Sequence, residues 1–130
     1  MMIEQSETDK GRIGRLGEEA VMRWLRQHGF EICARNWRSG AYELDLVARK
    51  YDRLHFVEVK TRRADGLTSP EAALTPAKIR SLHRAARLYM GTYKSRYGNY
   101  EPQFDLAAVR VAADDTMQVD LIEEVAPFAW

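Results

Sequence analysis

Two short segments, Glu43-Leu44-Asp45-Leu46-Val47 and Phe56-Val57-Glu58-Val59-Lys60-Thr61-Arg62, decide the fold of this chain. Apolar and polar residues alternate in both, which is typical of β-strands with one buried face. Side chains two apart on a strand share a face, so Glu58 and Lys60 point the same way. Charges within apolar strands are costly to bury. We therefore interpret them either as a paired structural network or as a site for metal or phosphate chemistry.

The sequence around these two strands predicts an α/β domain. Helical periodicity predicts helices over residues 10–28 and 76–91, the second capped by Thr75. Alternation predicts three further strands, over residues 30–37, 102–112 and 117–122. Short turns join the first three strands in an antiparallel meander, and the second helix permits a crossover that places the fourth strand parallel to the third. The expected fold is a mixed sheet of about five strands flanked by helices, in the order α-β-β-β-α-β-β.

Glycines and a polar segment add local expectations. Gly14 and Gly17 lie inside the first helix, where each costs about 1 kcal/mol relative to alanine, so we expect both to permit close packing. Residues 62–74 are polar and include Gly66 and Pro70. They predict a mobile loop.

Length and composition indicate a single domain over residues 1–130, with residues 1–9 expected to be flexible. The chain is 45% hydrophobic and 30% charged, as in soluble globular proteins. No apolar stretch reaches the length needed to cross a bilayer, and the polar N-terminus lacks the apolar centre of a secretion signal. A single cysteine, Cys33, excludes an internal disulfide and fits a reducing compartment. We expect a cytoplasmic protein without a membrane partner.

The net charge of +1 conceals an uneven distribution. Residues 60–96 carry nine basic side chains against Asp65 and Glu71, whereas residues 97–130 carry Arg110 against seven acidic side chains. Such a basic block favours a polyanionic partner. A solvated helix face offset by an acidic tail explains the charges equally well. The candidates for contact with nucleic-acid phosphates are Arg62, Arg63, Lys78, Arg80, Arg84 and Arg87.

Asp45, Glu58 and Lys60 are the candidates for chemistry. Neighbouring strands lie about 4.8 Å apart, so the two carboxylates could converge on one Mg²⁺ ion, which prefers oxygen ligands. Lys60 could position or deprotonate a water molecule or balance negative charge. Glu18, at the edge of the apolar stripe of the first helix, could reach toward the sheet. The alternative is a set of cross-strand ion pairs on a solvated face, and the residue types alone favour that alternative.

A resemblance to a known family changes this balance. The segments 14–20, 29–30, 34–38, 43–48 and 56–62, supported by residues 69–73, Lys78 and residues 104–106, resemble the YraN-type uncharacterised bacterial family. The resemblance runs in order over residues 11–110. That family is similar to the PD-(D/E)XK, restriction-endonuclease-like nucleases, and most closely to Holliday-junction resolvases. Tyr42 departs from the pattern, since the family commonly has glycine at this position.

The resemblance implies a restriction-endonuclease-like fold with Mg²⁺ or Mn²⁺ bound at the sheet edge. It implies that Asp45 is the first motif acid, and that Glu58 and Lys60 are the second acid and the lysine. Glu18 matches the helix glutamate of the resolvase-like branch, and the Val59 carbonyl would be a further metal ligand.

The expected function is a Mg²⁺-dependent DNA endonuclease, structure-selective or weakly sequence-specific, acting on branched or duplex DNA. The resemblance to dimeric resolvases also implies a homodimer. The alternative is a non-catalytic nucleic-acid-binding protein with a nuclease-like fold. A third reading is a scaffold that binds no nucleic acid.

Overall fold

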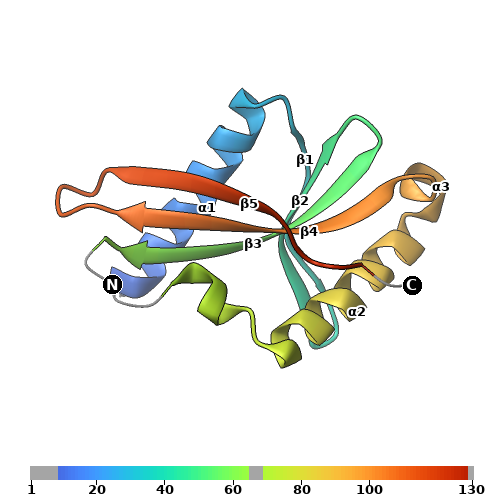
Figure 1. Cartoon of the computed structure of the whole chain (residues 1–130). Helices are drawn as coiled ribbons and strands as arrows, with labels where there is room; N and C mark the ends of the chain where they lie inside the picture. Colours follow the sequence, from blue (N-terminus) through green and yellow to red (C-terminus); the bar gives the residue numbers. More distant parts are fainter. Residues whose placement is uncertain (1–8, 65–68, 129–130) are drawn as a thin grey trace, which may run out of the picture.

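A mixed five-stranded sheet forms the centre of the molecule (Figure 1). The computed structural model describes residues 9–64 and 69–128. Its elements follow the order α1 (Asp9–Gln27), β1 (Glu31–Ser39), β2 (Tyr42–Lys50), β3 (Arg53–Arg63), the 3-10 helix η1 (Pro70–Ala73), α2 (Pro76–Thr92), α3 (Lys94–Tyr97), β4 (Glu101–Val111) and β5 (Met117–Ala126).

The strand order in the sheet is the same as the order in the chain. β1, β2 and β3 pair antiparallel. β3 then pairs parallel with β4, from Arg53 opposite Glu101 to Arg63 opposite Val111, and β4 pairs antiparallel with β5. This confirms the predicted fold class, the meander and the parallel crossover through the second helix.

The two long helices cover opposite faces of the sheet. Phe56 of β3 packs in a core with Tyr89 of α2, whereas the next residue, Val57, packs in a second core with Val21 and Leu25 of α1. Successive side chains of a strand point to opposite faces, so β3 contributes to both cores. Apolar residues therefore occupy both faces of this part of β3, and each face is covered by a helix.

The helix boundaries lie close to the predicted ones. Thr75 caps α2 as expected, because its Oγ1 accepts a hydrogen bond of 3.2 Å from Lys78 N, and Pro76 occupies the first turn, where no N–H is needed. α2 continues to Thr92 and is followed by the short helix α3, which the sequence pattern did not predict. No helix among the described residues is long and apolar enough to span a bilayer.

Only one of the two glycines in α1 permits a close contact. A Cβ atom on Gly17 would lie 2.1 Å from Thr61 Oγ1, so α1 can approach β3 this closely only with glycine there. The same expectation for Gly14 was wrong, because no described atom lies within 4 Å of its Cβ position. Gly14 instead borders the cavity described below.

The predicted mobile loop over residues 62–74 needs correction at both ends. β3 extends through Arg63 because its parallel pairing with β4 continues to that residue, and Pro70–Ala73 form a 3-10 helix. The middle of the predicted loop, residues 65–68, lies outside the described residues. So do residues 1–8 of the segment expected to be flexible, while Asp9 begins α1.

Candidate active site

The site begins where β2 separates from β3. Pairing between these strands ends at Leu46 opposite Val57, but β3 continues beside β4 as far as Arg63. The earlier residues of β2 remain paired with β1. The second half of β3 therefore has a strand on one side only, and side chains from both faces of the sheet can meet at its other side.

The side chain of Asp45 in β2 spans the opening between β2 and β3. Its Oδ2 accepts a hydrogen bond of 2.9 Å from Val59 N, which replaces the strand pairing that is missing here. The N–H and C=O groups of one residue in an extended strand point to the same side. The Val59 carbonyl therefore faces the same opening as Asp45.

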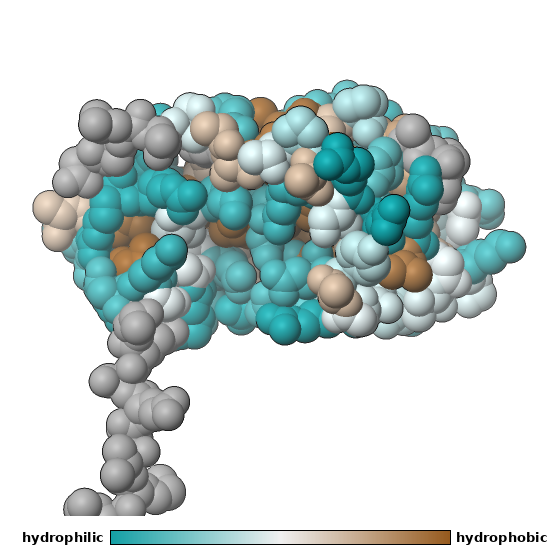
Figure 2. All heavy atoms as spheres, turned by 90° about the horizontal axis from the view of Figure 1, so that it is seen from below, coloured by the Kyte–Doolittle hydropathy of each residue, from teal (hydrophilic) through white to brown (hydrophobic). Residues whose placement is uncertain are grey.

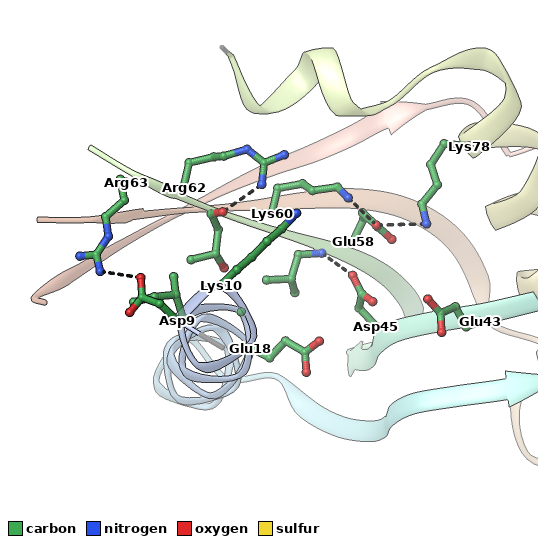
Figure 3. Close-up of a pocket in the computed structure, with 14 residues that line it drawn as sticks. Asp9, Lys10, Glu18, Glu43, Asp45, Glu58, Lys60, Arg62, Arg63 and Lys78 are labelled. Atoms are coloured by element: carbon green, nitrogen blue, oxygen red, sulfur yellow. Dashed lines mark hydrogen bonds and ion pairs between the residues drawn. The ribbon is translucent and has the colours of Figure 1, made fainter. Parts of the chain in front are cut away.

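Glu58 is the buried acid of the site, with 5% of its side chain exposed. Its Oε1 lies 3.5 Å from Lys60 Nζ and 3.4 Å from Lys78 Nζ (Figure 3). Burial raises the pKa of Glu58, the negative charge of Asp45 raises it further, and the two lysines act in the opposite direction. Because the net pKa shift is upward, the two lysines do not fully compensate the cost of the buried charge.

Glu18 of α1 joins the same electrostatic group. Its side chain is 19% exposed and lies 3.5 Å from Arg35 Nε. Burial raises the pKa of Glu18, and Asp45 raises it further, while Asn36 and Arg35 lower it. Asp45 of β2 therefore raises the pKa of the carboxyl groups of both Glu18 in α1 and Glu58 in β3.

These groups line a cavity of about 620 Å³. Figure 3 shows the acidic side chains of α1, β2 and β3 facing one another across it, with Lys60 and Lys78 beside Glu58. The lining residues are Asp9, Lys10, Ile13, Gly14, Glu18, Glu43, Asp45, Glu58, Val59, Lys60, Thr61, Arg62, Arg63 and Lys78. Acidic and basic groups line the same cavity, which suits a divalent cation together with a phosphate.

The candidate phosphate contacts divide into two groups. Arg62, Arg63 and Lys78 line the cavity. The side chain of Arg62 is exposed and donates to Thr61 O, whereas that of Arg63 pairs with Asp115 and Asp9.

The three arginines of α2 do not line the cavity. Arg80, Arg84 and Arg87 are exposed, and Arg84 donates to Tyr42 Oη at 2.9 Å. Figure 2 views the molecule from the side on which α2 lies in Figure 1, and this face is largely hydrophilic. Tyr42, at the position where the resemblance leads one to expect glycine, thus uses its hydroxyl to hold an arginine of α2.

Sequence reasoning missed three charged residues that line the cavity, Asp9, Lys10 and Glu43, and gave Lys78 only a phosphate role. Glu43 precedes Asp45 by two residues, and the alternation of a strand could have placed it on the same side. Asp9 and Lys10 come from the first turn of α1, and no local signal connects them with β3. Lys78 was expected to contact phosphate, and the structure adds its ion pair with Glu58, which depends on how α2 packs on the sheet.

Sequence comparisons identify the family. Residues 17–109 match the model of the uncharacterised protein family UPF0102. The chain belongs to this family. A UPF0102 protein of Bacteroides thetaiotaomicron is 36% identical over 116 residues, which cover 89% of this chain and 93% of the relative. One from Streptomyces griseus is 41% identical over 105 residues, covering 78% and 85%.

A third UPF0102 protein, from Oleidesulfovibrio alaskensis, is 46% identical over 100 residues. The match covers 77% of this chain but only 48% of that relative, so the chain spans about half of its length. The family is described as uncharacterised, so the function of this UPF0102 protein has to be argued from the geometry of its cavity.

Proposed function

We propose that this UPF0102 protein is a Mg²⁺- or Mn²⁺-dependent DNA endonuclease of the PD-(D/E)XK type, structure-selective or weakly sequence-specific. The observation that carries the proposal is the convergence of Asp45, Glu58 and Lys60 at the opening between β2 and β3, inside a cavity with basic walls. An acid on each of two adjacent strands, followed by a lysine beside the second acid, is the arrangement that the resemblance to these nucleases implies.

The oxygen atoms of the site fit a hard divalent cation. Within the described residues, the ion pairs of Glu58 use Oε1 and the hydrogen bond of Asp45 uses Oδ2. Glu58 Oε2, Asp45 Oδ1 and the Val59 carbonyl are thus the candidate ligands. Mg²⁺ commonly takes one or two protein carboxylates and completes its coordination with water and substrate phosphate. Burial, and then the charge of Asp45, raise the pKa of Glu58 and of Glu18, and a nearby cation would stabilise the charged form of both carboxyl groups.

A bound divalent cation would supply an activated water molecule and stabilise negative charge on the scissile phosphate. Lys60, whose side chain is 26% exposed, is placed to donate to the attacking water or to a phosphate oxygen. Glu18 lies across the cavity from Lys60, and its raised pKa brings the carboxyl group closer to the range in which a side chain exchanges protons efficiently.

Contacts with the DNA backbone would explain why we expect weak sequence specificity. The basic groups at the cavity, together with the exposed arginines of α2, would bind phosphates rather than bases. Phosphate contacts position a duplex without reading its sequence, and they make affinity strongly dependent on salt. Recognition of a branch or flap by its shape is consistent with such a surface.

The experiment that tests this function is a cleavage assay on branched, flapped and duplex DNA with Mg²⁺ or Mn²⁺. We expect the wild type to cut, and the double variant Glu58→Gln, Lys60→Ala to lose about 10²–10⁴-fold in rate, as is typical when a positioned acid, base or charge is removed. Glu43→Gln is the matched control. Glu43 lines the same cavity but pairs with Arg38 at its rim, so this variant should keep most of the activity. Equal cleavage by the wild type and the double variant would exclude the enzyme.

One observation favours a second candidate, a nucleic-acid-binding protein that does not cut. Glu58 has two cationic partners within the chain itself, Lys60 and Lys78, as in a purely structural network. Binding in gel shifts with a steep salt dependence, and no cleavage with any divalent cation, would support this candidate. If neither DNA binding nor Mn²⁺ binding is detected by calorimetry, both candidates fail.

A further inference from the structure

A second polar cluster lies at the other end of β3, away from the candidate active site. His55 of β3, Asp105 of β4 and Glu123 of β5 offer ligand atoms that all lie within 4.8 Å of one another. Among the described residues, this is the one group of three or more His, Cys, Asp or Glu side chains that satisfies this criterion. None of the three lines the cavity that holds Glu58.

The hydrogen bonds around Asp105 hold the cluster in place. Asp105 is fully buried, and His55 Nδ1 lies 2.6 Å from its Oδ2. Its Oδ1 accepts from Gln103 Nε2 at 2.8 Å and from Glu124 N at 3.1 Å. The last bond is possible because β5 bulges between its pairings with Phe104 and Leu106. A carboxylate that orients an imidazole in this way is the usual support of a metal-binding histidine.

The imidazole is buried and still reaches an open space. The side chain of His55 is 4% exposed, and the ring of Phe30 packs edge-on against it at 4.9 Å between centroids. No hydrogen bond from a described residue reaches its Nε2, on the ring edge away from Asp105. A cavity of about 350 Å³ is lined by both His55 and Glu123. This cavity gives an ion an entry path and room for a water ligand.

We propose that His55 Nε2 and Glu123, with Asp105 orienting the imidazole, form a binding site for a transition-metal ion of the Zn²⁺ class. One imidazole and one carboxylate, with space for water ligands in the cavity, are ligand types of Zn²⁺ and distinguish the site from an all-oxygen Mg²⁺ site. The carboxylate of Asp105 stays hydrogen-bonded to His55 Nδ1 and holds the ring in place. Because His55 lies on β3 and Glu123 on β5, the ion would tie the bulged part of β5 to β3. This proposal does not depend on the nuclease proposal.

The test uses the full chain after removal of metals with a chelator, titrated with Zn²⁺ by calorimetry and with Co²⁺ by visible absorption. We expect one equivalent of Zn²⁺ to bind, and Co²⁺ to show the absorption of a nitrogen-containing site. His55→Gln and Glu123→Gln should each weaken Zn²⁺ binding by at least about tenfold, the size of effect typical of altered metal sites. His28→Gln is the matched control, since His28 lines the same cavity outside the cluster. Glu58→Gln should also bind Zn²⁺ normally.

Thermal unfolding shows whether each variant is folded, so that lost Zn²⁺ binding can be told from lost structure. Glu123 is exposed, so Glu123→Gln should fold, and Zn²⁺ should raise the Tm of the wild type but not of this variant. The proposal is overturned if Glu123→Gln binds Zn²⁺ as tightly as the wild type, or if His28→Gln or Glu58→Gln loses the ion instead. It is also overturned if the metal-free wild type takes up no Zn²⁺, in which case the cluster is a structural hydrogen-bond network.

Discussion

The two halves of β3 carry polar side chains under opposite conditions. Over Arg53–Val57 the strand is paired on both sides, with β2 and with β4. His55 is buried there against Asp105, a carboxylate with three hydrogen-bond donors. Over Glu58–Arg63 the strand is paired with β4 alone. Within the described residues Asp45 accepts one hydrogen bond there, from Val59 N, and the pKa of Glu58 is raised.

This contrast indicates that the pairing of the strands, and not an unusual residue type, distinguishes the candidate active site. Aspartate, glutamate and lysine occur throughout the chain, and where β2 leaves β3 several of them line one cavity together with a buried glutamate. A carboxylate with all its hydrogen bonds supplied is part of the framework. Buried carboxyl groups with a raised pKa, such as those of Glu58 and Glu18, would be stabilised in their charged form by a cation. Substitutions in each half of β3 test whether its carboxylates differ in their hydrogen bonding and their pKa.

The largest effect is expected when the same substitution is made in each half. Asp105→Ala leaves His55 Nδ1, Gln103 Nε2 and Glu124 N without an acceptor, and should lower the free energy of unfolding by about 3–5 kcal/mol. Asp45→Ala should cost about 1 kcal/mol or less, because water in the cavity can bind Val59 N. Urea denaturation of both variants measures the difference. Equal losses would refute the contrast.

A second pair of variants tests how α1 is held over the open half of β3. Gly17→Ala places a methyl group 2.1 Å from Thr61 Oγ1, and should destabilise the protein by about 1–3 kcal/mol through overpacking. Gly14→Ala meets no described atom within 4 Å, so it should stabilise the helix by up to about 1 kcal/mol.

Thermal and urea unfolding of both glycine variants provide the measurement. In addition, Thr61→Ala should partly rescue Gly17→Ala, because it removes the clashing hydroxyl, which has no hydrogen-bond partner within the described residues. A Gly17→Ala variant as stable as the wild type would show that α1 does not depend on this contact.

A smaller effect is expected from the cap of α2, the helix that brings Lys78 to Glu58. Thr75→Ala removes the acceptor for Lys78 N and should cost about 1 kcal/mol. Thr75→Ser keeps the hydroxyl and serves as the control. Far-UV circular dichroism during urea unfolding reports both variants. If Thr75→Ala and Thr75→Ser are equally stable, the cap does not position the start of α2.

The smallest effect concerns pH. The pKa of Glu58 is raised in the folded protein, first by burial and then by Asp45. The folded state therefore holds this proton to a higher pH than the unfolded state does. Linkage then requires the contribution of Glu58 to stability to be greatest at low pH, and to fall as pH rises from its usual value of 4.5 through the raised pKa.

Carbon-detected NMR titration of the glutamate carboxyl groups measures this directly. Asp45→Asn should lower the pKa of both Glu58 and Glu18, because Asp45 raises both in the wild type. Glu43→Gln should leave them nearly unchanged. Unchanged pKa values in Asp45→Asn would mean that the three acids do not form one electrostatic group.

Much of the fold could be predicted from particular residues. The alternation in segments 43–47 and 56–62 placed β2 and β3, and Thr75-Pro76 fixed the start of α2, because these signals are local. The end of β3 and the helix α3 were missed. β3 runs on to Arg63 because β4 lies beside it, and no pattern within residues 62–63 encodes that neighbour. Gly14 and Gly17 look alike in sequence, and only the position of Thr61 separates them.

The sequence by itself determined the five strands, the two long helices, their order and the charged residues available for a site, because periodicity and caps act between neighbours in the chain. The tertiary structure alone decided which of those charges meet. The early end of the pairing between β2 and β3 brings α1 and α2 together with both strands around Glu58, and the bulge in β5 brings Glu123 and Glu124 to Asp105. These contacts depend on the register between strands, which follows from the hydrophobic patterns of both strands and the connection that joins them, and not from one segment alone.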